Sequence, residues 1–448
     1  MALDRGLLNV VLLGLAFMLV FTAFQTWGNI QKTMLESIKK DEPSFDGEAY
    51  YSLAIIYAFL AVFNWTSPSV ISMIGPKFAM LCGAVTYLLF IMSFAIPHTW
   101  LLYLASVVIG IGAAMIWTGQ GNYLALNSTE ATISRNSGLF WAMLQLSMFV
   151  GNIFVYFAFR GKDHIDGTTR QVVIWTLSAI ALSGIVVMVF FPKPPPKNVA
   201  DEVVEERVAG PLEALNRALK LFVTRDMLLL NVTFFYTGLE LGFWSGVYGS
   251  CISFTEDLPN RKELVGISGI FIGLGEVLGG AAFGILGAKT RKWGRDPIVI
   301  GGFILHLASF FVIFLNIPND APFTDTSSKA FITSNAILAI MCSFLLGLGD
   351  ACYNTQIYSI LGGVYADNSA SAFAIFKFTQ SVAAAASFFY ASELVLYGQI
   401  GILVIFAVLG TASFVWVEWR AKREVVDAAS TPSVSECSSH DNQGYDKS

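Results

Sequence analysis

The sequence predicts an all-α membrane protein with twelve transmembrane helices, arranged as two parallel halves of six helices. Three observations support this fold class. Hydrophobic residues make up 55% of the 448-residue chain and charged residues only 13%, whereas a soluble domain carries about 25% charged residues. The apolar runs are long enough to cross a bilayer, for which about 20 residues suffice. Finally, polar and glycine motifs of the first half recur in the second.

The apolar runs place the predicted spans at residues 7–30, 50–74, 77–96, 100–126, 138–159, 171–191, 226–250, 265–288, 297–317, 331–359, 372–393 and 399–417. The alternation of a transmembrane β-barrel is absent, so helices must satisfy the backbone in lipid. We therefore expect an N-terminal half (1–191), a cytoplasmic linker (192–225), a C-terminal half (226–417) and a disordered cytoplasmic tail (418–448).

The second part of the linker, from Pro211 to Val223, has an apolar face at helical spacing. The residues on that face are Leu212, Leu215, Leu219 and Phe222. This pattern predicts an amphipathic helix at the inner membrane surface. Seventeen of the 27 Lys and Arg residues fall on the side of the linker and nine on the other, with Lys377 inside a span. This bias predicts an integral multi-pass protein with both termini in the cytoplasm.

The halves repeat in the same order, which is typical of the major facilitator fold. In span four, Gly110-Ile-Gly112 is followed by Thr118 and Gln120, and this matches Gly347-Leu-Gly349 followed by Thr355 and Gln356 in span ten, with one gap. The other matched pairs are Gln145 with Gln380, Gln25 with Glu240, and Asn64 with Glu276. The titratable members of these pairs lie in the second half.

Glu240 and Glu276 lie near the middle of their spans, and Gly238 and Gly242 beside Glu240 allow a local break in the helix. A carboxyl buried at membrane depth without a cation can carry a proton. One of the two therefore marks a candidate central-cavity or coupling site, together with Gln25 and Asn64. The alternative is a protonated carboxyl hydrogen-bonded to a neighbouring helix. His306 fits an ordinary interior histidine better than a ligand.

Asp350 and Lys377 lie at matching depths on successive helices, which predicts an ion pair. It could be a static clasp between helices or part of a moving gate. Around it we expect a polar cluster that helps to satisfy the pair and lines the spans: Asn354, Thr355, Gln356, Gln380, Gln120 and Gln145.

The loop after span eight, Gly284 to Pro297, resembles the inner-loop signature of major facilitators, with Gly294 and Arg295 as its gate residues. In that family the basic residues of the loop latch the two halves. The matching first-half loop, Gly75-Pro76-Lys77, lacks the family's acid and arginine. This departure weighs against ordinary alternating access.

Three segments carry a more specific resemblance: Phe21 to Gln25 with Asn29, Arg135 to Ala142 with Gln145, and Gly347 to Asp350 with Asn354 to Gln356. They resemble the Unc-93-like proteins, the ion-channel regulatory branch of the major facilitator superfamily. The resemblance covers nearly the whole chain outside the linker and tail. It implies a twelve-helix fold and residence in a membrane. Relatives regulate a potassium channel or escort nucleic-acid-sensing receptors.

No catalytic triad, zinc-ligand spacing or phosphate-binding loop occurs in a soluble segment, so we expect no enzyme activity, metal or cofactor. No basic stripe indicates nucleic-acid binding. Two hypotheses remain. In the first, the protein regulates or escorts another membrane protein, such as a channel or receptor. In the second, it is a secondary transporter of a small solute, coupled to protons or cations.

Overall fold

The computed structural model describes residues 5–128, 132–193, 211–290, 294–365 and 368–430. Its helices are α1 (Arg5–Asp41), α2 (Ala49–Asn64), α3 (Ser67–Ile74), α4 (Pro76–Ser93), α5 (Thr99–Leu126), α6 (Ile133–Phe159), α7 (Gly167–Val189), α8 (Pro211–Phe222), α9 (Arg225–Gly242), a π-helical turn (Phe243–Val247), α10 (Tyr248–Phe254), α11 (Arg261–Thr290), α12 (Asp296–Asn316), α13 (Ala336–Gly363), α14 (Ser369–Ala391) and α15 (Leu396–Ser430). Among the described residues, eleven helical segments are long and apolar enough to span a membrane, and the bent pair α2 and α3 makes twelve if it counts as one span. The predicted all-α class is confirmed, and the predicted twelve spans agree with the count that includes the bent pair.

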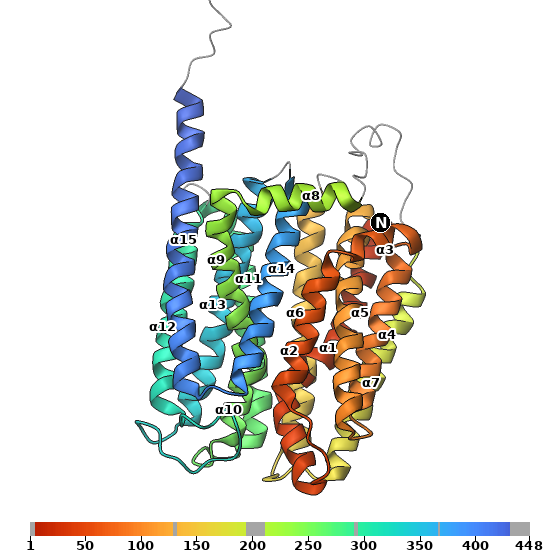
Figure 1. Cartoon of the computed structure of the whole chain (residues 1–448), viewed down its shortest axis with the longest axis vertical. Coiled ribbons are helices and arrows are strands. Elements are labelled where there is room, and N and C mark those ends of the chain that lie inside the picture. The colour runs from red at the N-terminus through yellow and green to blue at the C-terminus, as the bar shows by residue number, and fades with distance from the viewer. Residues whose placement is uncertain (1–4, 129–131, 194–210, 291–293, 366–367, 431–448) are drawn as a thin grey trace, which may run out of the picture.

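The helices form two bundles side by side, α1–α7 and α9–α15 (Figure 1). The amphipathic helix α8 lies across one end of the molecule, where α1 begins and α15 leaves the bundle (Figure 1). We call this end the α8 face and the opposite end the outer face. Between the bundles, α2 packs on α14 and α6 packs on α11. The division of the chain into two units with the boundaries 1–191 and 226–417 stays a prediction.

Equivalent glycines make equivalent helix contacts in the two halves. A Cβ on Gly110 would meet Ile56 of α2 at 2.7 Å, and one on Gly112 would meet Thr86 of α4. In the second half, a Cβ on Gly347 would meet the backbone of α11, and one on Gly349 would meet the ring of His306 on α12 at 2.2 Å. Small residues let helices approach closely in lipid. The predicted repeat of spans four and ten is therefore visible as packing.

The second span, predicted as one helix over 50–74, is broken. α2 ends at Asn64, and α3 follows at an angle of 67°. Pro68 stands in the first turn of α3, where it lacks a backbone donor and disfavours helical geometry in the residue before it. The hydroxyls of Thr66 and Ser67 donate to the carbonyl of Phe63 at 3.1 and 2.9 Å, which satisfies the end of α2.

The local break expected beside Glu240 is present. The π-helical turn Phe243–Val247 follows directly after Gly242, between α9 and α10. Gly238 and Gly242 on this helix press against α14, where an added Cβ would meet the Gln380 carbonyl at 2.2 Å and the Ser387 hydroxyl at 2.7 Å. π-Turns inside helices frequently occur at functional sites.

The tail was predicted to be disordered from residue 418, and this is wrong for its first part. α15 continues as a helix to Ser430. Its extension is tied to the bundle because Glu418, only 2% exposed, accepts hydrogen bonds from Arg295. The rest of the tail, 431–448, lies outside the described residues, as does linker segment 194–210.

We predict that a tag inserted in the linker and a tag after Ser448 are on the same side of the membrane. α8 and the end of α15 lie at one face of the bundle (Figure 1), and the Lys and Arg bias predicts that this face is cytoplasmic. Antibody access before and after permeabilisation of cells measures this. Staining of either tag at the plasma membrane of intact cells would contradict the topology.

Candidate functional site

The main candidate site is a cluster of acidic side chains inside the C-terminal half. Glu240 lies on α9, Glu276 on α11 and Asp350 on α13, and they are 1%, 5% and 8% exposed. Asp350 interacts electrostatically with both glutamates. Three of the sequence-predicted residues, from three different helices, are therefore brought into one buried acidic cluster.

Glu240 is joined to a histidine that is itself fully held. The Oε1 atom of Glu240 lies 3.3 Å from Nε2 of His306. The Tyr236 hydroxyl donates to Nδ1 of that histidine at 2.6 Å, and Nε2 lies 3.1 Å from the Leu346 carbonyl oxygen. The predicted interior histidine is thus satisfied on both nitrogens, and it forms one wall of the acidic cluster.

The cluster lacks well-aligned hydrogen bonds. Neither carboxyl oxygen of Glu240 nor Oε1 of Glu276 has one, and the indole nitrogen of Trp244, in the π-turn, is also without one. Only Asp350 is clearly satisfied, by the amide of Asn354 at 2.7 Å. Burial and mutual repulsion both oppose ionisation of neighbouring carboxyls. The predicted role of Glu240 or Glu276 as a proton or cation site stays a prediction.

The cluster has no metal-site geometry. Among the described residues, no three His, Cys, Asp or Glu side chains stand together in positions that could hold a metal ion.

The predicted ion pair between Asp350 and Lys377 does not form, and that prediction is wrong. The Lys377 ammonium instead donates to the Gln380 side chain at 3.0 Å and lies over the rings of Phe376 and Tyr358. Matching depth along two helices does not fix the rotation of each helix, and Asp350 faces the acidic cluster. Lys377 still interacts electrostatically with Asp350.

The other predicted polar residues are dispersed. On the N-terminal side, Gln25 accepts a hydrogen bond from Ser147, whereas Asn64 ends α2 at the bend. On α13, Gln356 donates to the neighbouring Thr355 hydroxyl at 3.1 Å. Gln120 and Gln380 are buried and Gln145 is half-buried. The six residues of the predicted polar cluster therefore do not form one continuous network.

The predicted gate residues do not latch the halves in this structure. Arg295 binds Glu418 at 2.8 Å and Ser359 at 2.9 Å, both within the C-terminal half. Gly294 adopts a φ of 89°, which favours glycine. Lys77, the basic residue of the first-half loop, donates to the carbonyls of Val189 and Phe191 at the end of α7. Each loop therefore caps helices of its own half.

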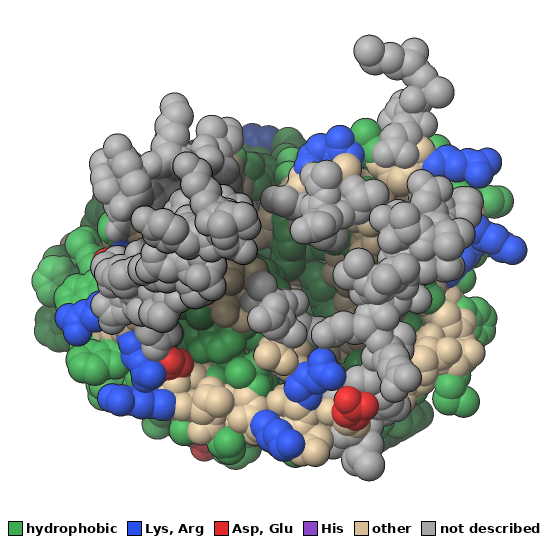
Figure 2. Space-filling model, turned by 90° about the horizontal axis from the view of Figure 1, so that it is seen from above, with side chains coloured by type: hydrophobic (Ala, Val, Ile, Leu, Met, Phe, Trp, Pro, Cys, Tyr) green, Lys and Arg blue, Asp and Glu red, His purple; other side chains and the backbone are tan. Residues whose placement is uncertain are grey.

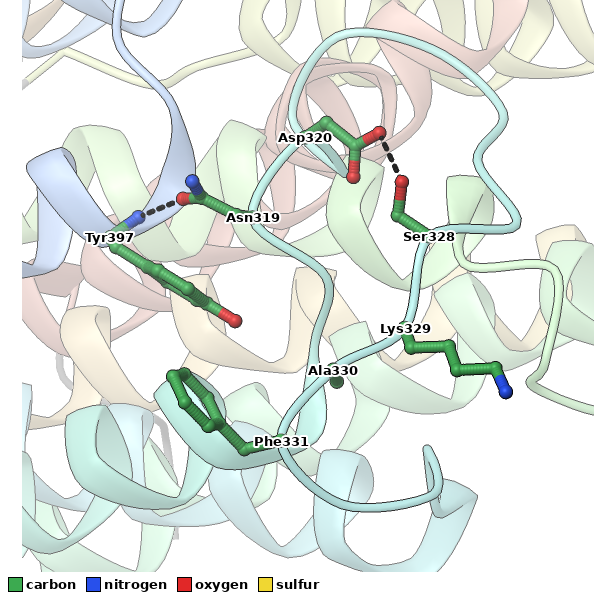
Figure 3. Close-up of a pocket in the computed structure, with 7 residues that line it drawn as sticks. All are labelled: Asn319, Asp320, Ser328, Lys329, Ala330, Phe331 and Tyr397. Atoms are coloured by element: carbon green, nitrogen blue, oxygen red, sulfur yellow. Dashed lines mark hydrogen bonds between the residues drawn. The ribbon is translucent and has the colours of Figure 1, made fainter.

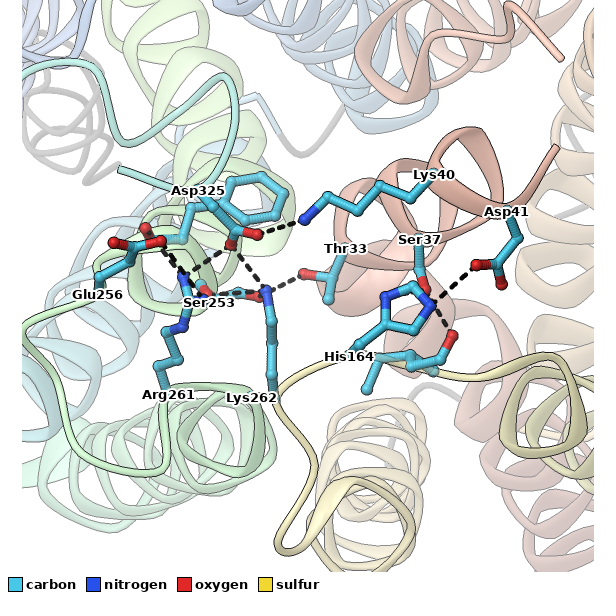
Figure 4. A network of polar contacts seen from close by, with 12 residues as sticks. Thr33, Ser37, Lys40, Asp41, His164, Ser253, Glu256, Arg261, Lys262 and Asp325 are labelled. Atoms are coloured by element: carbon cyan, nitrogen blue, oxygen red, sulfur yellow. Dashed lines mark hydrogen bonds and ion pairs between the residues drawn. The ribbon is translucent and has the colours of Figure 1, made fainter. Parts of the chain in front are cut away.

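A second polar site joins the halves at the outer face (Figure 4). The central residue is Asp325, in the loop between α12 and α13. It receives Lys40 of α1 at 2.6 Å, Arg261 at 2.7 Å and Lys262 at 3.1 Å. Nearby, the Thr33 hydroxyl of α1 donates to Ser253 at 2.9 Å, and Ser253 also accepts from Lys262. We call these six residues the outer clasp.

The loop that carries Asp325 is held in place beside an outer pocket (Figure 3). Asp320 accepts from the hydroxyls of Thr326 and Ser328 at 2.7 and 2.9 Å. The backbone of Thr326 pairs with Phe254 and Glu256 at the end of α10. These hydrogen bonds hold the loop so that Asp325 is in position to pair with Lys40.

The clasp keeps its acid ionised. Burial alone would raise the pKa of Asp325, but the hydrogen bond from Lys40 and the charges of Lys262 and Arg261 together lower it below 3.8. Sequence reasoning missed this site. The only available signal was opposite charge in separate outer segments, and nothing local pairs α1 with a loop almost three hundred residues later.

The family model described as "Ion channel regulatory protein UNC-93" matches residues 44–415. The chain belongs to the UNC-93 family. The resemblance found in the sequence is confirmed. UNC93-like protein MFSD11 of Xenopus laevis is 47% identical over 93% of this chain and 97% of its own length, and the Xenopus tropicalis protein is 45% identical over 94% and 98%. UNC93-like protein 3 of Arabidopsis thaliana is 25% identical over 89% of this chain and 83% of its own length.

Among solved structures, this member of the UNC-93 family is similar to the peptide transporter POT in complex with sulfate, with a TM-score of 0.64 and 12% identity over 94% of this chain and 95% of that one. The nucleoside transporter NupG gives 0.63 and 15% over 91% and 99%. These similarities confirm the major facilitator fold and an integral multi-pass membrane protein. At this identity they show the fold alone.

We predict that Glu240→Gln folds normally. The substitution replaces a buried carboxyl group that has no aligned hydrogen bond with an amide of the same shape. We therefore expect the free energy of unfolding to change by no more than about 1 kcal/mol. Glu418→Gln is the matched control, because it breaks a buried pair with Arg295 and is expected to cost about 3–5 kcal/mol. Thermal unfolding of both purified variants measures the difference. An equal loss in both would show that Glu240 is a structural group.

We predict that the outer clasp is insensitive to pH between about 5 and 7 and weakens only below about pH 4. A carboxylate with a lowered pKa contributes stability above its ordinary pKa, and this is lost as pH falls through the lowered value. Lys40, Arg261 and Lys262 face it, with Glu256 beside Arg261. The distance between spin labels at Asp46→Cys and Ser327→Cys reports the closure. Opening near pH 6 would rule out Asp325 as the titrating group.

Proposed function

We propose that this protein is a secondary transporter of a small solute that works by alternating access. One observation carries the proposal: hydrogen bonds and ion pairs between described residues of the two halves all lie toward the outer face. The N-terminal residues involved are Asn29, Thr33, Lys40, Tyr50 and Tyr51. On the α8 face, the ring contacts between described side chains of the two halves are Trp65 with Phe378 and Trp141 with Tyr358.

One-sided closure is what a transporter needs in one of its two end states. Figure 2 supports the open side, since the α8 face is hollowed between the halves and hydrophobic side chains lie deep in the hollow. A scaffold that only binds a partner has no need for halves that are joined by hydrogen bonds at one end and by aromatic contacts at the other.

The acidic cluster supplies the coupling. Glu240, Glu276 and Asp350 can exchange protons as the halves move and their exposure changes. All three acidic residues lie in the C-terminal half. Residues of the N-terminal half would then contact the solute without taking part in proton exchange. Neither this role nor the alternative involves covalent chemistry, so the protein is not an enzyme under either proposal.

The alternative is that the protein regulates or escorts another membrane protein, such as a channel or receptor. The description of the matching family model, an ion channel regulatory protein, favours this function. So does the first inner loop, whose Lys77 binds within its own half. For this function the halves need not exchange states, which makes the two proposals separable.

We predict that weakening the clasp opens the outer face and closes the α8 face together. Asp325→Asn leaves Lys40, Arg261 and Lys262 without their shared carboxylate. The outer labels at Asp46→Cys and Ser327→Cys should then report a longer distance, and labels at Asn122→Cys and Gly362→Cys on the α8 face a shorter one. Pulsed electron–electron resonance on reconstituted protein measures both.

Ser328→Ala is the control, because it loosens the same loop and leaves the Asp325 pairs in place. Outer opening with no change on the α8 face would refute alternating access and leave the regulatory role. A pH response of both distances in Asp325→Asn that is lost when Glu240→Gln is added would support proton coupling by the acidic cluster.

A further inference from the structure

A groove lies between α9 and α15 at the α8 face, outside both sites described above. Its volume is about 450 Å³, and its lining residues are Val223, Arg225, Leu228, Leu229 and Trp416. Three of these are apolar and strongly exposed: Val223 by 69%, Trp416 by 54% and Leu228 by 48%. Leu219, one turn before Val223 on α8, is 51% exposed and extends the same apolar stripe.

The groove has basic residues beside it. Arg225 lines it, and Lys220 lies three residues before Val223, on the same side of a helical turn. Arg225 and Lys220 are both exposed and form no ion pair or hydrogen bond with described residues. Other cations nearby are engaged, since Arg420 pairs with Asp226 at 3.0 Å and Lys422 pairs with Asp296. Charge that is left over at the groove is therefore positive and unmatched by this part of the chain.

The groove also lies at a defined depth. Arg225 begins one span, and the span that contains Trp416 ends at Arg423, about 10 Å further along the helix at 1.5 Å per residue. Apolar walls face the chain region of a bilayer there, and the cations face its headgroups. Tryptophan is enriched at this level of membrane proteins.

We propose that the groove binds an anionic phospholipid of the leaflet on the α8 side. Its phosphate is held by Arg225 and Lys220, and one acyl chain lies against Val223, Leu228 and Trp416. Charge complementarity chooses an anionic lipid over a zwitterionic one, since basic pockets at helix ends on the cytoplasmic side bind such headgroups. The amphipathic helix α8 would then be held on the membrane by a bound lipid as well as by its apolar face.

The test uses full-length protein, exchanged from detergent into nanodiscs of phosphatidylcholine with or without phosphatidylserine. Native mass spectrometry counts retained lipids and gives their relative affinity. We expect phosphatidylserine to be retained in preference, and Arg225→Gln or Lys220→Gln to weaken this about five-fold each. Lys193→Gln is the matched control, because it removes an exposed cation from the same face in the other half.

Equal retention of the two lipids, or an equal effect of Arg225→Gln and Lys193→Gln, would overturn the proposal. Displacement of phosphatidylserine by inorganic phosphate at matched ionic strength would identify a simple anion site and also overturn it. Trp416→Ala should reduce retention while the protein mass stays constant in light scattering. A mass that is halved by this substitution would show that a second copy of the chain covers the groove.

Discussion

The arrangement of the two halves depends on polar contacts between them, and among the described residues these hydrogen bonds and ion pairs lie toward the outer face. In lipid the hydrophobic effect contributes little to helix association, so close packing and polar contacts must hold the halves together. Glycines provide the packing within each half, and the outer clasp provides polar contacts between them. Asp325 is central because one carboxylate meets cations from both halves, Lys40 from one and Arg261 and Lys262 from the other. A contact of this kind can be broken and re-formed without disturbing the helices on either side.

The acidic cluster is a second constraint, of the opposite kind. The clasp gathers opposite charges and satisfies them, whereas the cluster gathers carboxyl groups that are only partly hydrogen-bonded. Glu240 and Glu276 each have at least one buried carboxyl oxygen without an aligned hydrogen bond. Such an arrangement is retained only where proton occupancy or a change of surroundings relieves it. The cluster lies beside the π-turn and the His306 ring. A change in the conformation of the π-turn would change the surroundings of Glu240.

Much of this could be predicted from the sequence, since its signals are local. Apolar length gives the spans, and glycine spacing gives the contacts of α5 and α13. Glu240, Glu276 and Asp350 could be singled out from the sequence because a carboxyl inside a long apolar span is rare. What failed depends on helix rotation and on distant pairing. The partner of Lys377 was wrong because depth alone does not say which way a side chain faces. The bend before Pro68 was not predicted because the long apolar run around it fits a single span. The extension of α15 was not predicted because it depends on the pair of Glu418 with Arg295, which lies far away in the sequence.

The first inner loop, Gly75-Pro76-Lys77, bears on how the α8 face could close. A short loop without the usual acid and arginine cannot latch the halves on the α8 face, and Lys77 caps α7 instead. Closure of that face would then rest on aromatic contacts such as Trp141 with Tyr358, which lie close to Lys377. A cation over a ring is a modest and adjustable attraction, about 0.5–2 kcal/mol. Lys377, which lost its predicted role as a clasp for Asp350, is therefore well placed to respond to the acidic cluster on one side and to the inner aromatic contact on the other.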